Sequence, residues 1–142
     1  MSTGKVVLVA DDYPDSADLL CHLLEIKGGY ETLWVDNGRD AVARCGERRI
    51  DIAILDFEMP ELDGLAAAQR IRKMLGDARP MLIALTGRAY MAEVSKSGTF
   101  DRVFEKPVSG EDLFRALEGA IGATGSSGTT GTSEDKPESS PP

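Results

Sequence analysis

Residues 52–64 read IAILDFEMPELDG, and this stretch decides the fold. Four apolar side chains, Ile52 to Leu55, stand at consecutive positions, which is typical of a central strand buried on both faces of a parallel sheet. An acid, Asp56, follows directly, and a loop containing Pro60 and Gly64 leads into a segment of helical periodicity. The stretch therefore predicts a buried strand, an acidic turn and a helix, in that order.

Apolar runs alternate with helix-period segments over most of the chain. Further strands are expected at residues 6–10, 32–35, 81–85 and 102–105. Helices are expected from Pro14 to the Gly28-Gly29 stop, from Asn37-Gly38, after Gly64, between Ala89 and Lys96, and from Ser109, which has capping-box spacing to Asp112. This alternation predicts a doubly wound α/β fold, a parallel sheet with helices on both faces.

Length and composition predict one domain with a polar tail. The 142 residues suffice for a single core, which we expect within residues 1–122. After Ala123, residues 124–142 consist of Gly, Ser, Thr, Pro and charged residues without core-forming side chains, so a disordered tail is predicted at residues 123–142. A linker to a further domain is the alternative.

Charge and hydropathy narrow the classes of partner. The formal net charge of -8 argues against direct binding to nucleic acid or to an anionic membrane surface. The apolar run that follows Met1 to Lys5 is too short for a signal peptide or a membrane span, so a cytoplasmic location is expected.

Three further side chains are interpreted as structural. Cys21 and Cys45 have no metal-type spacing, and both are expected as small buried side chains on helices of a cytosolic protein. Trp34 is expected in the core, on the second strand.

Polar side chains follow four of the five predicted strands at their carboxyl ends. In an open parallel sheet these ends share one edge, where ligands bind. The residues, each expected at the first loop position after its strand, are Asp11 with Asp12, Asp56, Thr86 and Lys106.

This set of residues has a chemical logic. Three crowded carboxylates repel one another unless a cation lies among them, and hard oxygen ligands suit Mg²⁺. Such an ion stabilises a phosphoryl group in transit, and an aspartate can act as the nucleophile. Lys106 can pair with the acceptor carboxylate, and Thr86 can donate its hydroxyl to a phosphoryl oxygen.

The same residues carry a family resemblance. Asp11-Asp12, LDFEMPELDG at residues 55–64, ALTG at residues 84–87 and Lys106-Pro107 resemble, in this order, the motifs of response-regulator receiver domains of two-component systems. The resemblance spans residues 5–121 and implies a flavodoxin-like sheet of five strands in the order 2-1-3-4-5 with five helices; a family member is itself the standard example of that order.

The resemblance also implies roles. Asp56 matches the phosphoacceptor, Asp11 and Asp12 match the Mg²⁺-holding acids, and Glu58 matches the residue whose backbone carbonyl completes the metal site. Phosphate would come from a histidine kinase or a histidine phosphotransfer protein. The chain would be a phosphoprotein that signals by protein–protein contact, as a monomer or weak dimer, and not an enzyme beyond its own phosphorylation and dephosphorylation.

The sequence differs from the receiver family at some positions, and alternative functions stay open. Val103 stands where many receivers have an aromatic residue, and the segment between Thr86 and Lys106 is short, which predicts a short fourth helix. We also expect Glu58 and Arg88 to flank the site. The alternatives are a phosphorylation-independent binding module with this fold and a Mg²⁺-dependent aspartyl-phosphate hydrolase. Such hydrolases have Asp-x-Asp after the first strand, whereas Asp11 and Asp12 are adjacent here.

Overall fold

The computed structural model describes residues 3–122 and divides the chain into two compact units. The first unit ends at Gly110, and the second begins at Glu111. The expected tail at residues 123–142 lies outside the described residues, so the predicted domain limit stays a prediction. Within residues 3–122, no helix combines the length and apolar character needed to cross a bilayer.

The first unit is built on five parallel strands in the spatial order β2-β1-β3-β4-β5. Every residue of β1 and β3 is buried, as their apolar sequences predict, whereas the edge strands are partly exposed. The predicted order and the doubly wound fold are both confirmed. The strand bounds are β1 Val6–Ala10, β2 Glu31–Val35, β3 Ile52–Asp56, β4 Met81–Thr86 and β5 Arg102–Glu105.

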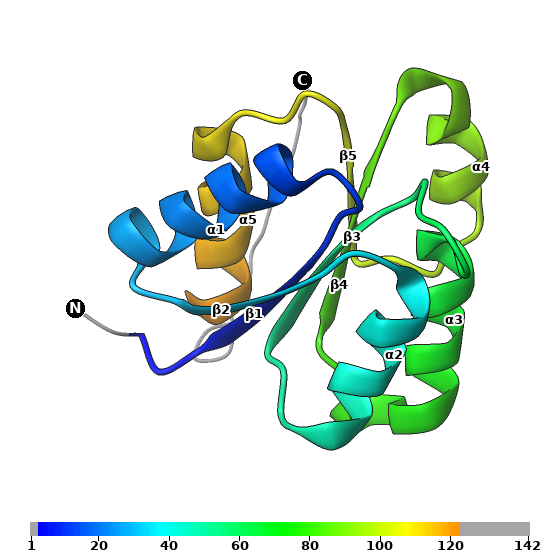
Figure 1. Cartoon of the computed structure of the whole chain (residues 1–142), viewed down its shortest axis with the longest axis horizontal. Helices are drawn as coiled ribbons and strands as arrows, with labels where there is room; N and C mark the ends of the chain where they lie inside the picture. Colours follow the sequence, from blue (N-terminus) through cyan, green and yellow to red (C-terminus); the bar gives the residue numbers. More distant parts are fainter. Residues whose placement is uncertain (1–2, 123–142) are drawn as a thin grey trace. The chain divides into compact units, whose positions relative to one another are not determined.

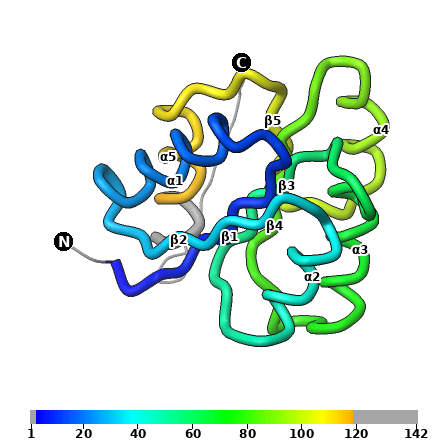
Figure 2. Tube along the Cα trace, viewed as in Figure 1, coloured from blue at the N-terminus to red at the C-terminus, as the bar shows by residue number. Residues whose placement is uncertain are grey.

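Helices of the first unit cover both faces of this sheet. Figure 1 shows α1 on one side and α2, α3 and α4 on the other, and the trace in Figure 2 follows the same path. The second unit, as far as it is described, consists of α5, which begins at the boundary between the units. The bounds are α1 Pro14–Gly28, α2 Gly38–Glu47, α3 Gly64–Leu75, η1 Gly76–Ala78, η2 Arg88–Tyr90, α4 Met91–Lys96 and α5 Gly110–Gly122.

Side-chain caps determine where α2 and α3 begin. The side-chain oxygen of Asn37 accepts a hydrogen bond from the Asp40 amide, and that of Asp63 accepts one from the Ala66 amide, each at 2.8 Å. These bonds satisfy amides that have no partner within the helix. The caps fix the points at which the chain leaves β2 and the loop after β3.

The core between the sheet and helices α2 and α3 is aliphatic. Alternate residues of the strands point to this face because the side-chain period of a strand is two. Its fully buried members include Leu8, Ala53, Leu55, Ile71 and Leu82. A smaller cluster under α4 contains Phe57, Ala84 and Val94.

Three expectations need correction. Asp56 and Thr86 are the last residues of β3 and β4 and not the first loop residues, because both still pair with the neighbouring strand. Trp34 is 46% exposed and so not in the core, since β2 is an edge strand. Cys45 is buried as expected, but Cys21 is only half-buried, and both thiols are free. The predicted shortness of the fourth helix is confirmed, because α4 has six residues.

Candidate functional site

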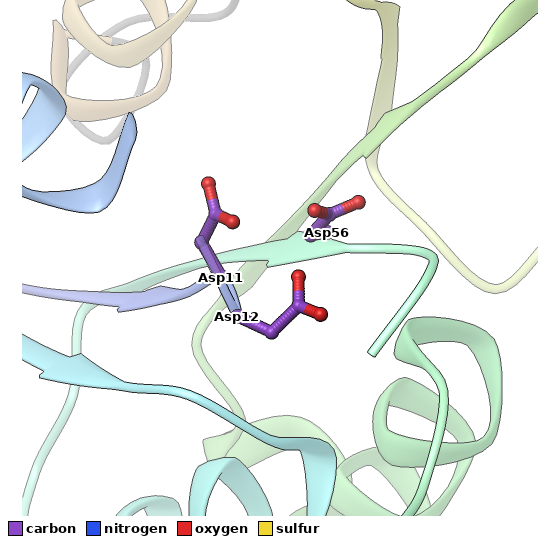
Figure 3. Close-up of side chains that lie close together, drawn as sticks. All are labelled: Asp11, Asp12 and Asp56. Carbon is purple, nitrogen blue, oxygen red and sulfur yellow. The ribbon is translucent and has the colours of Figure 1, made fainter. Parts of the chain in front are cut away.

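Three carboxylates meet at the carboxyl end of the sheet. One oxygen from each of Asp11, Asp12 and Asp56 lies within 4.8 Å of the others. Figure 3 shows Asp11 and Asp12 at the end of β1 and Asp56 at the end of β3, with their carboxylates turned toward a common space. Asp11 and Asp56 are buried, with 4% and 3% of their surface exposed, and Asp12 is exposed. The predicted convergence of these three residues is found in the structure.

An ammonium group approaches this cluster from the loop after β5. Lys106 Nζ donates to both carboxylate oxygens of Asp56, each at 3.0 Å. The amide of Lys106 donates to the carbonyl of Thr86 at 2.8 Å, which ties this loop to the end of β4. Lys106 is thereby directed to Asp56 by the same strand pairing that forms the sheet.

The environment of Asp56 disfavours its negative charge. Burial raises the pKa of this carboxyl, and the nearby charge of Asp11 adds to the rise. Hydrogen bonds and charge from Lys106 and the Glu58 amide act in the opposite direction but do not cancel the effect of burial. A buried acid with one cation and a second acid beside it is a group that a further cation would stabilise.

The loop after β3 holds its shape through close backbone contacts. The amide of Glu58 donates to Asp56 Oδ1 at 3.3 Å, and the amide of Gly64 donates to the carbonyl of Phe57 at 2.8 Å. A Cβ at Gly64 would lie 2.4 Å from the Asp56 carbonyl oxygen, so this position has no room for a side chain. Glu58 itself is exposed, which leaves its surroundings open to solvent and to a ligand.

Thr86 and Arg88 have partners that the sequence did not predict. Thr86 is fully buried, and its hydroxyl donates to the Gly87 carbonyl at 3.3 Å. The Arg88 guanidinium pairs with Glu105 at 3.1 Å on an exposed surface and not with Glu58. Burial of Thr86 beside Lys106 is compatible with a role at the site, whereas the exposed Arg88 pair contributes little on its own.

Two contacts near the site were missed by the sequence reasoning. The indole N–H of Trp34 donates to the backbone carbonyl of Asp11 at 2.8 Å. The rings of Phe57 and Tyr90 pack with centroids 4.8 Å apart, which joins the loop after β3 to the segment before α4. No short motif signals either contact, because each depends on the packing of residues distant in sequence.

The set of donors fits a hard divalent cation. Carboxylate oxygens, with a backbone carbonyl and waters, are the ligands that Mg²⁺ takes in proteins, often together with a phosphate oxygen. Such an ion would reduce the repulsion among the three acids and would lower the raised pKa of Asp56. The arrangement can therefore hold a cation next to a buried carboxylate that is already paired with a lysine.

The comparison with protein families gives a decisive match. The sequence model of the response regulator receiver domain matches residues 7–118. The chain belongs to the response-regulator receiver domain family. Receiver domains are signalling domains of two-component systems, and they are phosphorylated by histidine kinases or phosphotransfer proteins.

Curated relatives of this receiver domain differ in length. The chemotaxis protein CheY of Thermotoga maritima is 33% identical over 116 residues, which cover 80% of this chain and 95% of that protein. The transcriptional regulatory protein ZraR of Salmonella typhimurium is 34% identical over 124 residues, which cover 85% of this chain but only 27% of ZraR. The chain thus spans about a quarter of the length of this longer relative.

Two solved structures of similar fold are described with magnesium. The receiver domain of sensor histidine kinase PA1611 from Pseudomonas aeruginosa, described with a magnesium ion in its active-site cleft, has a TM-score of 0.75 and 28% identity, covering 84% of this chain and 99% of that one. TrrA from Thermotoga maritima, in complex with Mg²⁺ and BeF, has a TM-score of 0.73 and 33% identity, covering 80% and 96%.

Proposed function

We propose that this receiver domain accepts a phosphoryl group on Asp56 from a phosphorylated histidine of a histidine kinase or a histidine phosphotransfer protein. The observation that carries the proposal is the contact of Lys106 Nζ with both oxygens of Asp56, beside two further acids. Of the three acids, Asp56 is the one that Lys106 contacts, whereas Asp11 accepts a hydrogen bond from the Tyr13 amide and Asp12 faces solvent.

A magnesium site forms part of the proposal. The carboxylates of Asp11, Asp12 and Asp56 and the backbone carbonyl of Glu58 would hold the ion. When bound, Mg²⁺ supplies positive charge next to the oxygens of the transferring phosphoryl group. This assignment is supported by the donor set of the chain and by the magnesium described in the receiver domains of PA1611 and TrrA.

Three side chains of the site have different roles in the proposed transfer. A carboxylate oxygen of Asp56 forms a bond to phosphorus while the bond from phosphorus to the donor histidine nitrogen breaks, and its electron pair returns to the imidazole. Lys106 neutralises negative charge on the acceptor and then on the phosphoryl oxygens. The Thr86 hydroxyl turns from the Gly87 carbonyl to donate to a phosphoryl oxygen.

The output is proposed to be a protein–protein contact in the cytoplasm, by a monomer or weak dimer. Phosphorylation adds negative charge and strong acceptor oxygens at the strand ends, which draws the Thr86 hydroxyl toward phosphorylated Asp56 and moves the Lys106 contact onto the phosphoryl oxygens. The net charge of -8 supports a protein partner over nucleic acid or an anionic membrane.

The direct test uses acetyl phosphate with Mg²⁺ and intact-mass spectrometry. Wild-type protein is expected to gain the mass of one phosphoryl group when Mg²⁺ is present and to gain none when a chelator is added during labelling. Asp56→Asn is expected to gain none in either condition. Asp77→Asn, which changes an exposed acid of η1, serves as the matched control and should label like wild type. Label in Asp56→Asn at the wild-type level contradicts the assignment, and no label in wild type favours a phosphorylation-independent binding module.

A further inference from the structure

Trp34 contacts the loop that carries the acids although it lies on another strand. Its indole N–H donates to the backbone carbonyl of Asp11, with 2.8 Å between nitrogen and oxygen. Trp34 is on β2, the edge strand beside β1, and its side chain is 46% exposed. An aromatic ring so exposed gains only part of the benefit of burial, so its directional hydrogen bond is the more informative feature.

The side of the sheet to which Trp34 points follows from strand geometry. Leu33 and Val35 pack into the core under α2 and α3. Because alternate side chains point to opposite faces, Trp34 and Thr32 point to the face that α1 covers. There they line a groove of about 350 Å³ between β2 and α1, whose other walls include Pro14 and Cys21.

Three hydrogen bonds hold Asp11 in place. Its amide donates to the carbonyl of Val35 at 3.1 Å, its carbonyl accepts from Trp34, and its carboxylate accepts from the Tyr13 amide at 2.9 Å. Two of these bonds come from consecutive residues of β2. The edge strand thus fixes both the amide and the carbonyl of one acid of the site.

The carbonyl that Trp34 holds belongs to the peptide plane between Asp11 and Asp12. A peptide plane is rigid, so fixing its oxygen also fixes the direction in which the next Cα leaves it. The next residue, Asp12, is the exposed one of the three acids, so packing restrains its side chain least. Holding this plane reduces the conformational freedom that Asp12 must lose when the three carboxylates close around a cation.

We propose that Trp34 is a positioning residue for the acid pair, which raises the affinity of the site for Mg²⁺ by orienting the Asp11–Asp12 peptide plane. The inference rests on the proposed function, because it takes the three acids as a metal site. Trp34 touches no reacting atom and acts through the backbone of Asp11. Residues that orient metal ligands commonly change metal affinity by about tenfold or more when they are removed.

The test compares Mg²⁺ dissociation constants of full-length variants by isothermal titration calorimetry. Trp34→Phe keeps an aromatic ring and removes the N–H donor, and it is expected to raise the dissociation constant about tenfold. Thr32→Val changes the same face of β2 and the same groove without touching Asp11, and it should bind Mg²⁺ like wild type. Urea unfolding without metal separates any loss of stability from the loss of affinity.

A second readout does not depend on metal. Without Mg²⁺, the Tyr13 amide, which donates to the Asp11 carboxylate, should exchange with solvent faster in Trp34→Phe than in Thr32→Val. If Trp34→Phe does not fold, a chain with benzothienylalanine at position 34 keeps the shape of indole and replaces the N–H by sulfur, and the same results are expected.

The outcomes separate the two proposals. Wild-type affinity in Trp34→Phe, or equal weakening in Thr32→Val, overturns the positioning role and leaves the metal site intact. Absence of saturable Mg²⁺ binding by wild type contradicts the proposed metal site itself and, with it, this inference.

Discussion

The two ends of the sheet use aspartates in opposite ways. At the carboxyl end, Asp11 and Asp56 are buried close together, with Asp12 beside them. At the amino end, Asp101 accepts from the Leu82 amide at 2.7 Å and pairs with Arg79 through two nitrogens, at 2.7 and 3.0 Å. Asp51 similarly accepts from the Val6 amide at 2.8 Å and pairs with Arg49 at 3.1 Å.

The pKa values reflect this difference. Burial raises the pKa of Asp56 beyond what Lys106 can offset. For Asp101, burial acts in the same direction, but hydrogen bonds from Arg79 and the Leu82 amide outweigh it and leave the pKa below its ordinary value. The amino end therefore stabilises the fold, whereas the carboxyl end keeps carboxylates that need a cation, which is typical of functional sites.

The largest expected effect is at the amino end. Asp101→Ala leaves the Leu82 amide without its acceptor and Arg79 without its partner, so we expect a loss of about 3 kcal/mol in the free energy of unfolding. Urea denaturation measures it, and Asp77→Ala, at an exposed acid, should change stability by less than about 0.5 kcal/mol. Equal stabilities of the two variants would remove the structural role assigned to Asp101.

The opposite sign is expected at the carboxyl end. Asp56→Asn removes a buried negative charge close to Asp11, so in the absence of metal we expect the free energy of unfolding at neutral pH to rise by about 1 kcal/mol. The measurement is urea denaturation with a chelator present. A loss of stability in this variant would mean that the pairing with Lys106 outweighs the burial of the charge.

The smallest effect is in the pH dependence of stability. The pKa of Asp101 is lowered by folding, so its contribution is present above the ordinary pKa of 3.8 and is lost as the pH falls through the lower, folded value. The pKa of Asp56 is raised, so the deficit of wild type relative to Asp56→Asn should shrink as the pH falls through the raised value toward 3.8. Urea unfolding at several pH values measures the difference in free energy of unfolding between wild type and each of the variants Asp101→Ala and Asp56→Asn. As the pH falls, the advantage of wild type over Asp101→Ala should shrink, and so should its deficit relative to Asp56→Asn, so the two differences change with opposite signs. Changes of the same sign would contradict the comparison.

Much of the site could be predicted from the sequence because its members follow apolar runs. Asp11, Asp56 and Lys106 stand directly at the ends of strands, and parallel strands bring these ends together whatever the remaining packing. The order of the strands came from the family resemblance, since periodicity does not say which strands are neighbours.

Other features could not be predicted because they depend on distant packing. A tryptophan in an apolar run is predicted to lie in the core, and Trp34 is exposed because β2 is at the edge of the sheet. Arg79 and Asp101 are 22 residues apart, and in sequence each resembles an ordinary surface charge. The direction of the Thr86 hydroxyl depends on its rotamer, on which the sequence carries no information.

We infer that the carboxyl end of the sheet keeps an unfavourable group of carboxylates for a cation that the proposed phosphoryl transfer requires. The most direct test measures the free energy of unfolding of wild type and Asp56→Asn by urea denaturation, with a chelator and with saturating Mg²⁺. We expect Asp56→Asn to be the more stable protein without metal and Mg²⁺ to reverse the order, because the ion stabilises the folded wild type by mass action and the variant much less. Equal stabilisation of both proteins by Mg²⁺, with their order unchanged, would contradict it.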